Sequence, residues 1–355
     1  MSNPARVLIL DTYYPDFIKS WVEADIPYDE ELKRVLSVMF GTGDSYSHWL
    51  RVLGYETRDV IGNFEALQKK WYKENHIPWN YVGGKDVAFQ QIRSFDPDIL
   101  FLQDLSFFHP DEIAHIREEY HVNLVAAQCS CPWPGDDRVK MCDVIFTSFP
   151  HYVEKIQALG VRGEYSRLAF DPRILGMLPS KERRYPISFI GGVGYPSHWK
   201  AGLEMLETVA DHVPEFSWFG YGVETLPDSY KLKKRYISQA WGLRMYELLA
   251  DYKIILNRHG EVALNYANNM KMYETTGMGA LLLTDHKSNL AEIFEPNKEC
   301  VSYTSAEHAA DLARFFLENP EKARRIADAG QERCLSEHNY YNKMLRISSV
   351  LKEML

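Results

Sequence analysis

The residues with the clearest chemical potential lie between positions 269 and 285. Asn269-Met270-Lys271-Met272-Tyr273-Glu274-Thr275-Thr276-Gly277-Met278-Gly279-Ala280 precedes the apolar run Leu281-Leu282-Leu283-Thr284-Asp285. The pattern predicts a short helix, a turn of small residues and a buried strand. Asn269 is a good N-cap, and the free amides and dipole of a helix N-terminus suit a phosphate group.

Two charged side chains extend this prediction. Lys271 places a positive charge at the start of the helix, and Glu274 lies about one turn further on. A cation, a helix N-terminus and a carboxylate together suit a diphosphate joined to a polyhydroxylated group. Met270 and Tyr273, on the same helix, join them as candidate binding residues. An ordinary surface helix and strand of an α/β domain is the structural alternative.

The elements around this segment follow an alternating plan of strands and helices. Buried strands are predicted at residues 6–11, 55–61, 99–102, 123–127 and 143–148, and a second series at 186–192, 216–220 and 253–257. Because such alternation requires crossover connections, each series predicts a parallel sheet. We therefore expect two Rossmann-like, doubly wound domains facing a cleft, residues 1–170 and 171–338, with a last helix, 339–355, crossing back onto the first domain.

Composition narrows the class of protein. The 355 residues are 46% hydrophobic and 25% charged, which is ordinary for globular proteins. The formal net charge of −9 argues against general nucleic-acid binding. Five cysteines, no apolar run of membrane-spanning length and no signal-peptide form favour a cytoplasmic protein without a transmembrane segment.

With the second half laid out, the order of its motifs resembles the GT-B glycosyltransferases, closest to the group with a CgeB-like C-terminal domain related to retaining family 4. The resembling segments are Phe189-Ile190-Gly191-Gly192, Met245-Tyr246-Glu247-Leu248-Leu249-Ala250, Ile254-Ile255-Leu256-Asn257, Lys271-Met272-Tyr273-Glu274, Gly277-Met278-Gly279-Ala280-Leu281-Leu282-Leu283-Thr284 and Cys300-Val301-Ser302-Tyr303. The resemblance covers about residues 186–338.

The resemblance implies a nucleotide-diphosphate-sugar donor bound mainly by the second domain. Glu274 matches the glutamate that contacts the donor ribose, and Lys271 replaces the more usual arginine. Gly191 and Gly192 let backbone approach the phosphates, and Lys200 supplies a cation from the following helix. Family 4 enzymes often carry another glutamate eight positions before the first; here that position is Tyr266.

Further candidates follow strands of the second domain. Arg258 and His259 come directly after Asn257, where either could neutralise the leaving diphosphate; surface loop residues are the alternative. Ser238 could border the nucleobase. The run Lys231, Lys233, Lys234 and Arg235 is interpreted as a solvated face rather than a nucleic-acid patch.

The first domain offers acceptor-side candidates. Gly43 and Asp44 belong to a glycine loop that opens a helix containing His48. Near a helix N-terminus the pKa of His48 should fall, which makes it a candidate base; packing beside Trp49 is the alternative. Asp104 and Gln128 follow apolar strands, and Asp104 is a candidate for activating an acceptor hydroxyl, or else a helix cap or turn acid.

No metal site is predicted. Cys129-Ser130-Cys131-Pro132 lacks a second ligand pair, and Asp136-Asp137 is a single acidic pair. The hypothesis is a metal-independent, retaining glycosyltransferase of GT-B form that needs no cofactor besides its co-substrate. A glycan, a lipid-linked glycan, a protein or a small molecule could be the acceptor. A nucleotide-sugar epimerase or hydrolase of related fold, and a non-catalytic nucleotide-sugar-binding subunit, are the alternatives.

Overall fold

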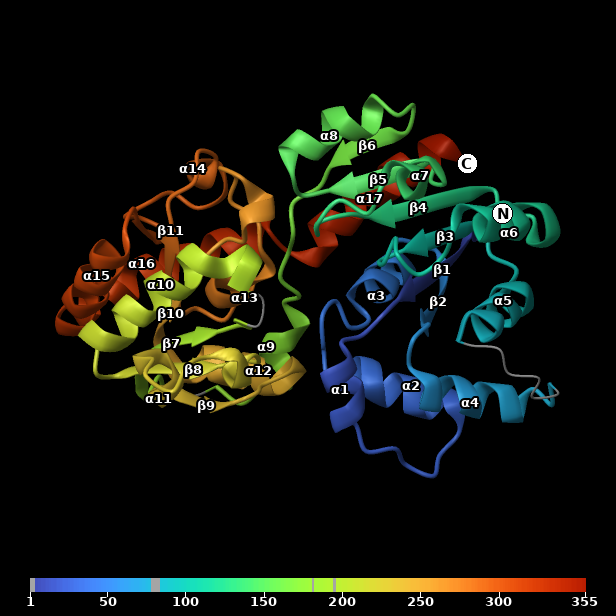
Figure 1. Ribbon diagram of the computed structural model, residues 1–355. Helices are drawn as coiled ribbons and strands as arrows, with labels where there is room; N and C mark the ends of the chain where they lie inside the picture. The colour runs from blue at the N-terminus through green and yellow to red at the C-terminus, as the bar shows by residue number, and fades with distance from the viewer. Residues whose placement is uncertain (1–3, 78–83, 181, 194–195) are drawn as a thin grey trace. The chain divides into compact units, whose positions relative to one another are not determined.

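The computed structural model describes residues 4–77, 84–180, 182–193 and 196–355, without the side chains of residues 84 and 196–201. The chain divides into two compact units, residues 1–167 with 340–355, and residues 168–339. Each unit has its own sheet and its own covering helices (Figure 1).

The first unit is built on a six-stranded parallel sheet. Its order is β2-β1-β3-β4-β5-β6. The strands are β1 (Arg6–Asp11), β2 (Glu56–Ile61), β3 (Ile99–Leu102), β4 (Leu124–Gln128), β5 (Val144–Thr147) and β6 (Arg162–Tyr165). β1 pairs with β2 on one side and β3 on the other, so the chain changes direction across the sheet at β1. The carboxyl ends of these strands meet at one edge, where doubly wound sheets bind ligands.

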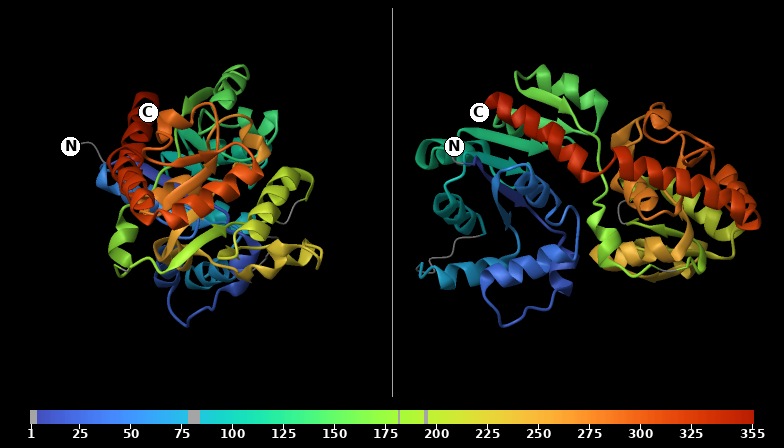
Figure 2. Two further views of the ribbon diagram at one scale, coloured as in Figure 1. Left: turned by 90° about the vertical axis from the view of Figure 1, so that its left-hand side faces the viewer. Right: turned by 180° about the vertical axis from the view of Figure 1, so that it is seen from behind.

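The helices of the first unit come from both ends of the chain. They are α1 (Pro15–Ser20), α2 (Tyr28–Ser37), α3 (Ser45–Val52), α4 (Glu65–Glu74), α5 (Gly84–Phe95), α6 (Pro110–Tyr120), α7 (Asp136–Lys140), α8 (Pro150–Gln157) and α17 (Tyr340–Met354). The C-terminal helix α17, red in Figure 2, packs against α3. The C-terminal helix α17 belongs to the first unit.

The second unit repeats the plan with the sheet order β12-β11-β10-β7-β8-β9. Its strands are β7 (Tyr185–Ile190), β8 (Phe216–Phe219), β9 (Tyr236–Ser238), β10 (Tyr252–Leu256), β11 (Leu281–Asp285) and β12 (Val301–Tyr303). Here the change of direction falls between β7 and β10, which pair in parallel. Residues that follow these two strands are therefore the natural place for a ligand site.

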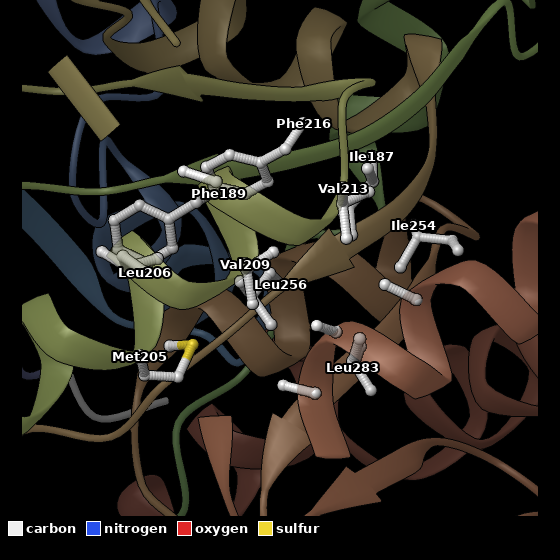
Figure 3. Packing of buried hydrophobic residues seen from close by; sticks show 14 of the residues in the cluster. Ile187, Phe189, Met205, Leu206, Val209, Val213, Phe216, Ile254, Leu256 and Leu283 are labelled. Atoms are coloured by element: carbon white, nitrogen blue, oxygen red, sulfur yellow. The ribbon is translucent and has the colours of Figure 1, made fainter. Parts of the chain in front are cut away.

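Helices and apolar side chains complete the second unit. The helices are α9 (Arg173–Met177), α10 (Pro196–His212), α11 (Lys231–Lys234), α12 (Gly242–Asp251), α13 (Met270–Gly277), α14 (Leu290–Ile293), α15 (Ala306–Glu318) and α16 (Pro320–Glu337), with short 3-10 turns at Val223–Thr225 and Glu261–Ala263. Figure 3 shows Phe189 of β7 beside Leu206 of α10 in the core. Complete burial of such a side chain contributes about 1.5–3 kcal/mol to folding.

The structure confirms the predicted α/β class and its doubly wound sheets. The edge strands β6, β9 and β12 are absent from the sequence prediction, and β12 is only three residues long. β6 reads Arg-Gly-Glu-Tyr and β9 reads Tyr-Ile-Ser, so neither has the apolar run of a strand buried on both faces. Among the described helices, none is both long and apolar enough to cross a membrane.

Candidate functional site

Asn269 caps α13 and fastens it to the end of β10. Its Oδ1 accepts a hydrogen bond from Met272 N at 3.2 Å, which confirms the predicted helix cap. Its Nδ2 donates to Asn257 Oδ1 at 2.9 Å and to Arg258 O at 3.0 Å. The buried Asn257 donates in turn to Thr284 Oγ1 at 2.9 Å. The positive end of the α13 dipole is therefore fixed at the carboxyl ends of β10 and β11.

Lys271 and Glu274 form an ion pair on the first turns of α13. Lys271 Nζ lies 2.7 Å from Glu274 Oε2, and the side chains are 15% and 7% exposed. Tyr246 of α12 donates its hydroxyl to Glu274 Oε1 at 3.3 Å. Both carboxylate oxygens thus have partners, and the charge pair is held in one geometry without a ligand. Tyr246 belongs to a segment that carried the resemblance, but spacing alone did not connect it with Glu274.

His259 lies inside the second unit rather than on a surface loop. Its Nδ1 is 2.6 Å from Asp285 Oδ1, its Nε2 is 3.0 Å from Met272 Sδ, and the ring is 0% exposed. Burial raises the pKa of Asp285, but the hydrogen bond and charge of His259, together with Lys287, outweigh it and leave the pKa below the ordinary value. His259 thus connects the ends of β10 and β11 with α13, and its catalytic role stays a prediction.

The glycines after β7 make room for aromatic side chains. A Cβ atom on Gly192 would lie 2.2 Å from the ring of Tyr221, so that ring fits only beside a glycine. Tyr221 stacks on Trp241 with ring centroids 5.8 Å apart and an angle of 20° between the rings. Gly191 N donates to Phe219 O at 2.9 Å, which holds the loop on β8. An aromatic pair therefore stands at this edge, which the sequence analysis did not single out.

The remaining donor-side candidates have different surroundings. Arg258 and Met270 are partly exposed, and Ser238 is exposed at the end of β9, where its carbonyl accepts from Gly220 N at 3.0 Å. Tyr273 is buried against Phe294 and His338, so it belongs to the core. The side chain of Lys200, in α10, lies outside the described residues.

In the first unit, the glycine loop leads into α3. Gly43 has a φ of +52°, and its Cβ position is 3.1 Å from Met39 Cα, so both conformation and space favour glycine. Asp44 Oδ2, at the N-cap of α3, lies 3.9 Å from Nη2 of Arg51 in the last turn of that helix. The ring of His48 meets Trp49 edge-on, with centroids 4.8 Å apart. The contact expected from packing is therefore present, and a catalytic role for His48 stays a prediction.

Gln128 belongs to a buried polar network at the end of β4. Its Oε1 accepts from Tyr46 OH at 2.7 Å and from Lys343 Nζ at 3.4 Å, and its Nε2 donates to Ser130 Oγ at 2.7 Å. Lys343, on α17, also donates to Arg167 O at 2.9 Å and Ser166 Oγ at 3.1 Å. Burial lowers the pKa of Lys343 to about 7. Lys343 was missed because nearly all its partners lie far away in sequence.

Asp104 and Asp11 follow the neighbouring strands β3 and β1. Asp104 accepts from Thr12 Oγ1 at 2.6 Å and from Ser106 N and Oγ at 2.7 and 2.6 Å, which is the contact pattern of a turn acid. The carboxylate of Asp11 accepts from Thr12 N at 2.8 Å, its one hydrogen bond among the described residues. Burial raises its pKa to about 7, the Thr12 N–H lowers it, and the charges of Asp104 and Asp59 raise it further. The described residues hold no group of three or more potential metal ligands.

Comparison with known proteins identifies similar sequences and folds. Residues 200–349 match a family model described as glycosyl transferase-like. The fold resembles HepE from Anabaena, solved in complex with UDP-glucose, with a TM-score of 0.62 and 11% identity over 98% of this chain and 99% of that one. The structure of sucrose-phosphate synthase from Thermosynechococcus elongatus matches with a TM-score of 0.60 and 11% identity over 99% of both chains.

A third structure with a similar fold is that of an epimerase. UDP-GlcNAc 2-epimerase from Neisseria meningitidis, bound to UDP-GlcNAc, matches with a TM-score of 0.53 and 10% identity over 98% of this chain and all of that one. Among curated proteins, no sequence matches. The fold is thus that of GT-B proteins, and residues 200–349 are similar to a glycosyl transferase-like family. The CgeB-like subgroup stays a prediction.

Proposed function

We propose that this protein transfers a sugar from a nucleotide-diphosphate sugar to an acceptor hydroxyl. The observation that carries the proposal is the N-terminus of α13, capped by Asn269 and followed by the Lys271–Glu274 pair, within the region that matches the glycosyl transferase-like model. A fixed helix N-terminus and a cation favour the diphosphate, and a carboxylate favours ribose hydroxyls.

The roles of individual residues follow from their surroundings. The first-turn amides of α13 bind the diphosphate, and Lys271 opposes its charge. Glu274, held by Lys271 and Tyr246, accepts hydrogen bonds from the ribose. The partly exposed Arg258, two residues after the end of β10, stabilises the departing nucleotide diphosphate. A nucleobase would stack on the ring pair Tyr221 and Trp241.

The same proposal covers the metal requirement, the stereochemistry, the cellular setting and the partners of the reaction. We infer a metal-independent, retaining transfer in glycan biosynthesis from the family resemblance. All five cysteines are free thiols, which supports a reducing, cytoplasmic setting. The net charge of −9 supports the absence of a nucleic-acid partner.

Calorimetric titration in EDTA tests the donor site. Wild-type protein is titrated with UDP, GDP and ADP and with the corresponding nucleotide hexoses. One nucleoside diphosphate should bind, and Glu274→Gln and Lys271→Met should each weaken that binding at least tenfold. The exposed Glu295–Lys298 pair, also three residues apart with a 2.8 Å contact, supplies the controls Glu295→Gln and Lys298→Met. Equal affinities in all five proteins would refute the site assignment.

Epimerisation is the second candidate, because the epimerase fold also matches. Incubation with UDP-GlcNAc in the absence of an acceptor separates the two activities. An epimerase would convert the sugar under these conditions, whereas a transferase releases little UDP until an acceptor is added. A protein that binds the donor but forms no product with any acceptor would be a non-catalytic subunit.

A further inference from the structure

At the ends of β1 and β2, the first unit carries side chains to which the proposed function assigns no role. Asp11 is the last residue of β1, and Gly62 directly follows β2. The two ends are adjacent, because Gly62 N donates to Asp11 O at 2.9 Å. This is the carboxyl edge of the sheet at its change of direction, where open α/β sheets bind ligands.

An aromatic ring covers the backbone beside Asp11. A Cβ atom on Gly62 would lie 2.5 Å from Cζ of Phe107, so the ring of Phe107 packs directly on this glycine. Phe107 is nevertheless partly exposed. An apolar ring face and a carboxylate, presented by neighbouring loops, match the two surfaces of a sugar. The C–H face of a sugar packs on an aromatic ring, and its hydroxyls donate to a carboxylate.

The carboxylate of Asp11 retains capacity for a ligand. Its Oδ1 accepts from Thr12 N, and its Oδ2 has no hydrogen-bond partner among the described residues. Asp104, by contrast, is occupied by Thr12 and Ser106. A carboxylate has about four acceptor positions, so Asp11 can bind two further donors.

A second, independent observation points to a missing partner here. Tyr13 is 3% exposed, and its buried hydroxyl has no hydrogen-bond partner in the described part of the chain. The hydroxyl lies close enough to Asp11, Asp59 and Asp44 that their charges, together with burial, raise its pKa. Buried polar atoms in native proteins are nearly always paired, so a ligand hydroxyl is a natural partner for this phenol.

A separate cavity lies along α1 and α4 of the same unit. This cavity of about 970 Å³ is lined by α1, α4 and the segment between α1 and α2, and it includes Pro15 and Asn63. Asn63 exchanges two hydrogen bonds with the backbone of Tyr13, at 2.9 and 2.8 Å. Asp11, Tyr13 and Phe107 do not line this cavity, and Asn63 connects its wall with the backbone beside Asp11.

We propose that Asp11, Phe107 and Tyr13 form an acceptor subsite for a carbohydrate. The proposal deepens the proposed function, since it selects a glycan from among glycan, lipid, protein and small-molecule acceptors. Phe107 stacks on the face of the sugar ring, and Asp11 accepts hydrogen bonds from two of its hydroxyls. Tyr13 pairs with a third polar atom of the sugar.

The charges around Asp11 set the pH range of binding. The groups that face it are Asp104 after β3, Asp59 on β2 and the Thr12 amide, and no cation is among them. The ionised carboxylate accepts hydrogen bonds from hydroxyls more strongly than the neutral acid does. Saccharide binding should therefore strengthen as the pH rises through about 7, and Asp11→Asn should remove this dependence.

Saturation-transfer NMR on the full chain without a donor tests the subsite independently of the transferase proposal. The probes are glucose, N-acetylglucosamine, maltose, cellobiose and chitobiose. At least one should show transfer with wild type; Asp11→Asn and Phe107→Leu should reduce it at least fivefold, and Phe107→Tyr should retain it. Phe89→Leu is the matched control, because Phe89 and Phe107 both contact Phe108.

Two results would overturn the subsite. One is the absence of transfer to every probe in wild type; the other is equal transfer in wild type, Asp11→Asn and Phe107→Leu. Nucleotide titration of the same proteins identifies the separate case in which the donor proposal fails. Circular dichroism confirms that each variant is folded, and Phe107→Tyr keeps the test informative if Phe107→Leu is unfolded.

Discussion

Replacing Lys343 by methionine should make the protein more stable at pH 6 and remove a large pH dependence. Lys343 is 6% exposed, and Nζ donates to the Gln128 side chain, Ser166 and the Arg167 carbonyl. None of these partners is a carboxylate. A charged ammonium group is costly in such a place because neutral hydrogen-bond acceptors replace only part of the charge stabilisation that water provides.

The magnitude follows from the pKa of the lysine. Burial lowers it from 10.5 to about 7, and each pH unit corresponds to about 1.36 kcal/mol, so the full cost is about 5 kcal/mol. The unfolded chain holds the proton more tightly than the folded chain. The cost is therefore fully present below pH 7 and is relieved, at about 1.4 kcal/mol per unit, as the pH rises toward 10.5.

Lys343→Met removes that cost and also three hydrogen bonds, each worth about 1 kcal/mol. The variant should be more stable than wild type by about 2 kcal/mol at pH 6 and less stable by about 1 kcal/mol at pH 9. Urea unfolding at both pH values measures the difference. Lys352→Met, on the exposed side of α17, should show no such change. A pH-independent difference between wild type and Lys343→Met would refute a buried, titrating lysine.

Other perturbations test separate parts of the account. Gly192→Ala should displace the Tyr221 ring, lower stability by about 1–3 kcal/mol and weaken nucleotide binding, as measured by thermal unfolding with and without the nucleotide. Asn269→Ala should cost about 1 kcal/mol through loss of the α13 cap; an unchanged Tm would contradict the capping role. Asp285→Asn should reduce the loss of folding stability that acid causes. Because the pKa of Asp285 is depressed in the folded protein, its carboxylate stabilises the fold above about pH 4, and this contribution is lost as the pH falls further. Acid titration of stability, with Asp16→Asn as an exposed control, checks this sign.

The features that sequence could predict are local ones. Apolar runs such as Ile99–Leu102 and Leu281–Asp285 predict buried strands because parallel strands are covered on both faces. Asn269 predicts the start of α13 because an N-cap acts within three residues. The edge strand β6 escaped prediction because its polar residues lack that signal.

The contacts that assemble the candidate site depend on distant segments. Glu274 meets Tyr246 across two helices, and Gln128 meets Lys343 across 215 positions of sequence. The spacing of these residues in the sequence predicts neither contact. The same holds for Phe107, whose ring reaches Gly62 from the loop after a different strand. Candidate residues can be proposed from sequence, but their partners emerge only once the sheet order is known.

The most direct test of the central claim follows the anomeric carbon of a donor labelled with carbon-13 at that position. UDP-, GDP- and ADP-hexoses are each incubated with the protein and a set of saccharide acceptors in EDTA, and carbon NMR records the product. The account predicts a new glycoside signal and release of the nucleoside diphosphate that depend on the acceptor and are lost in Glu274→Gln. An epimerised nucleotide sugar formed without acceptor, or no reaction of any donor, would contradict it.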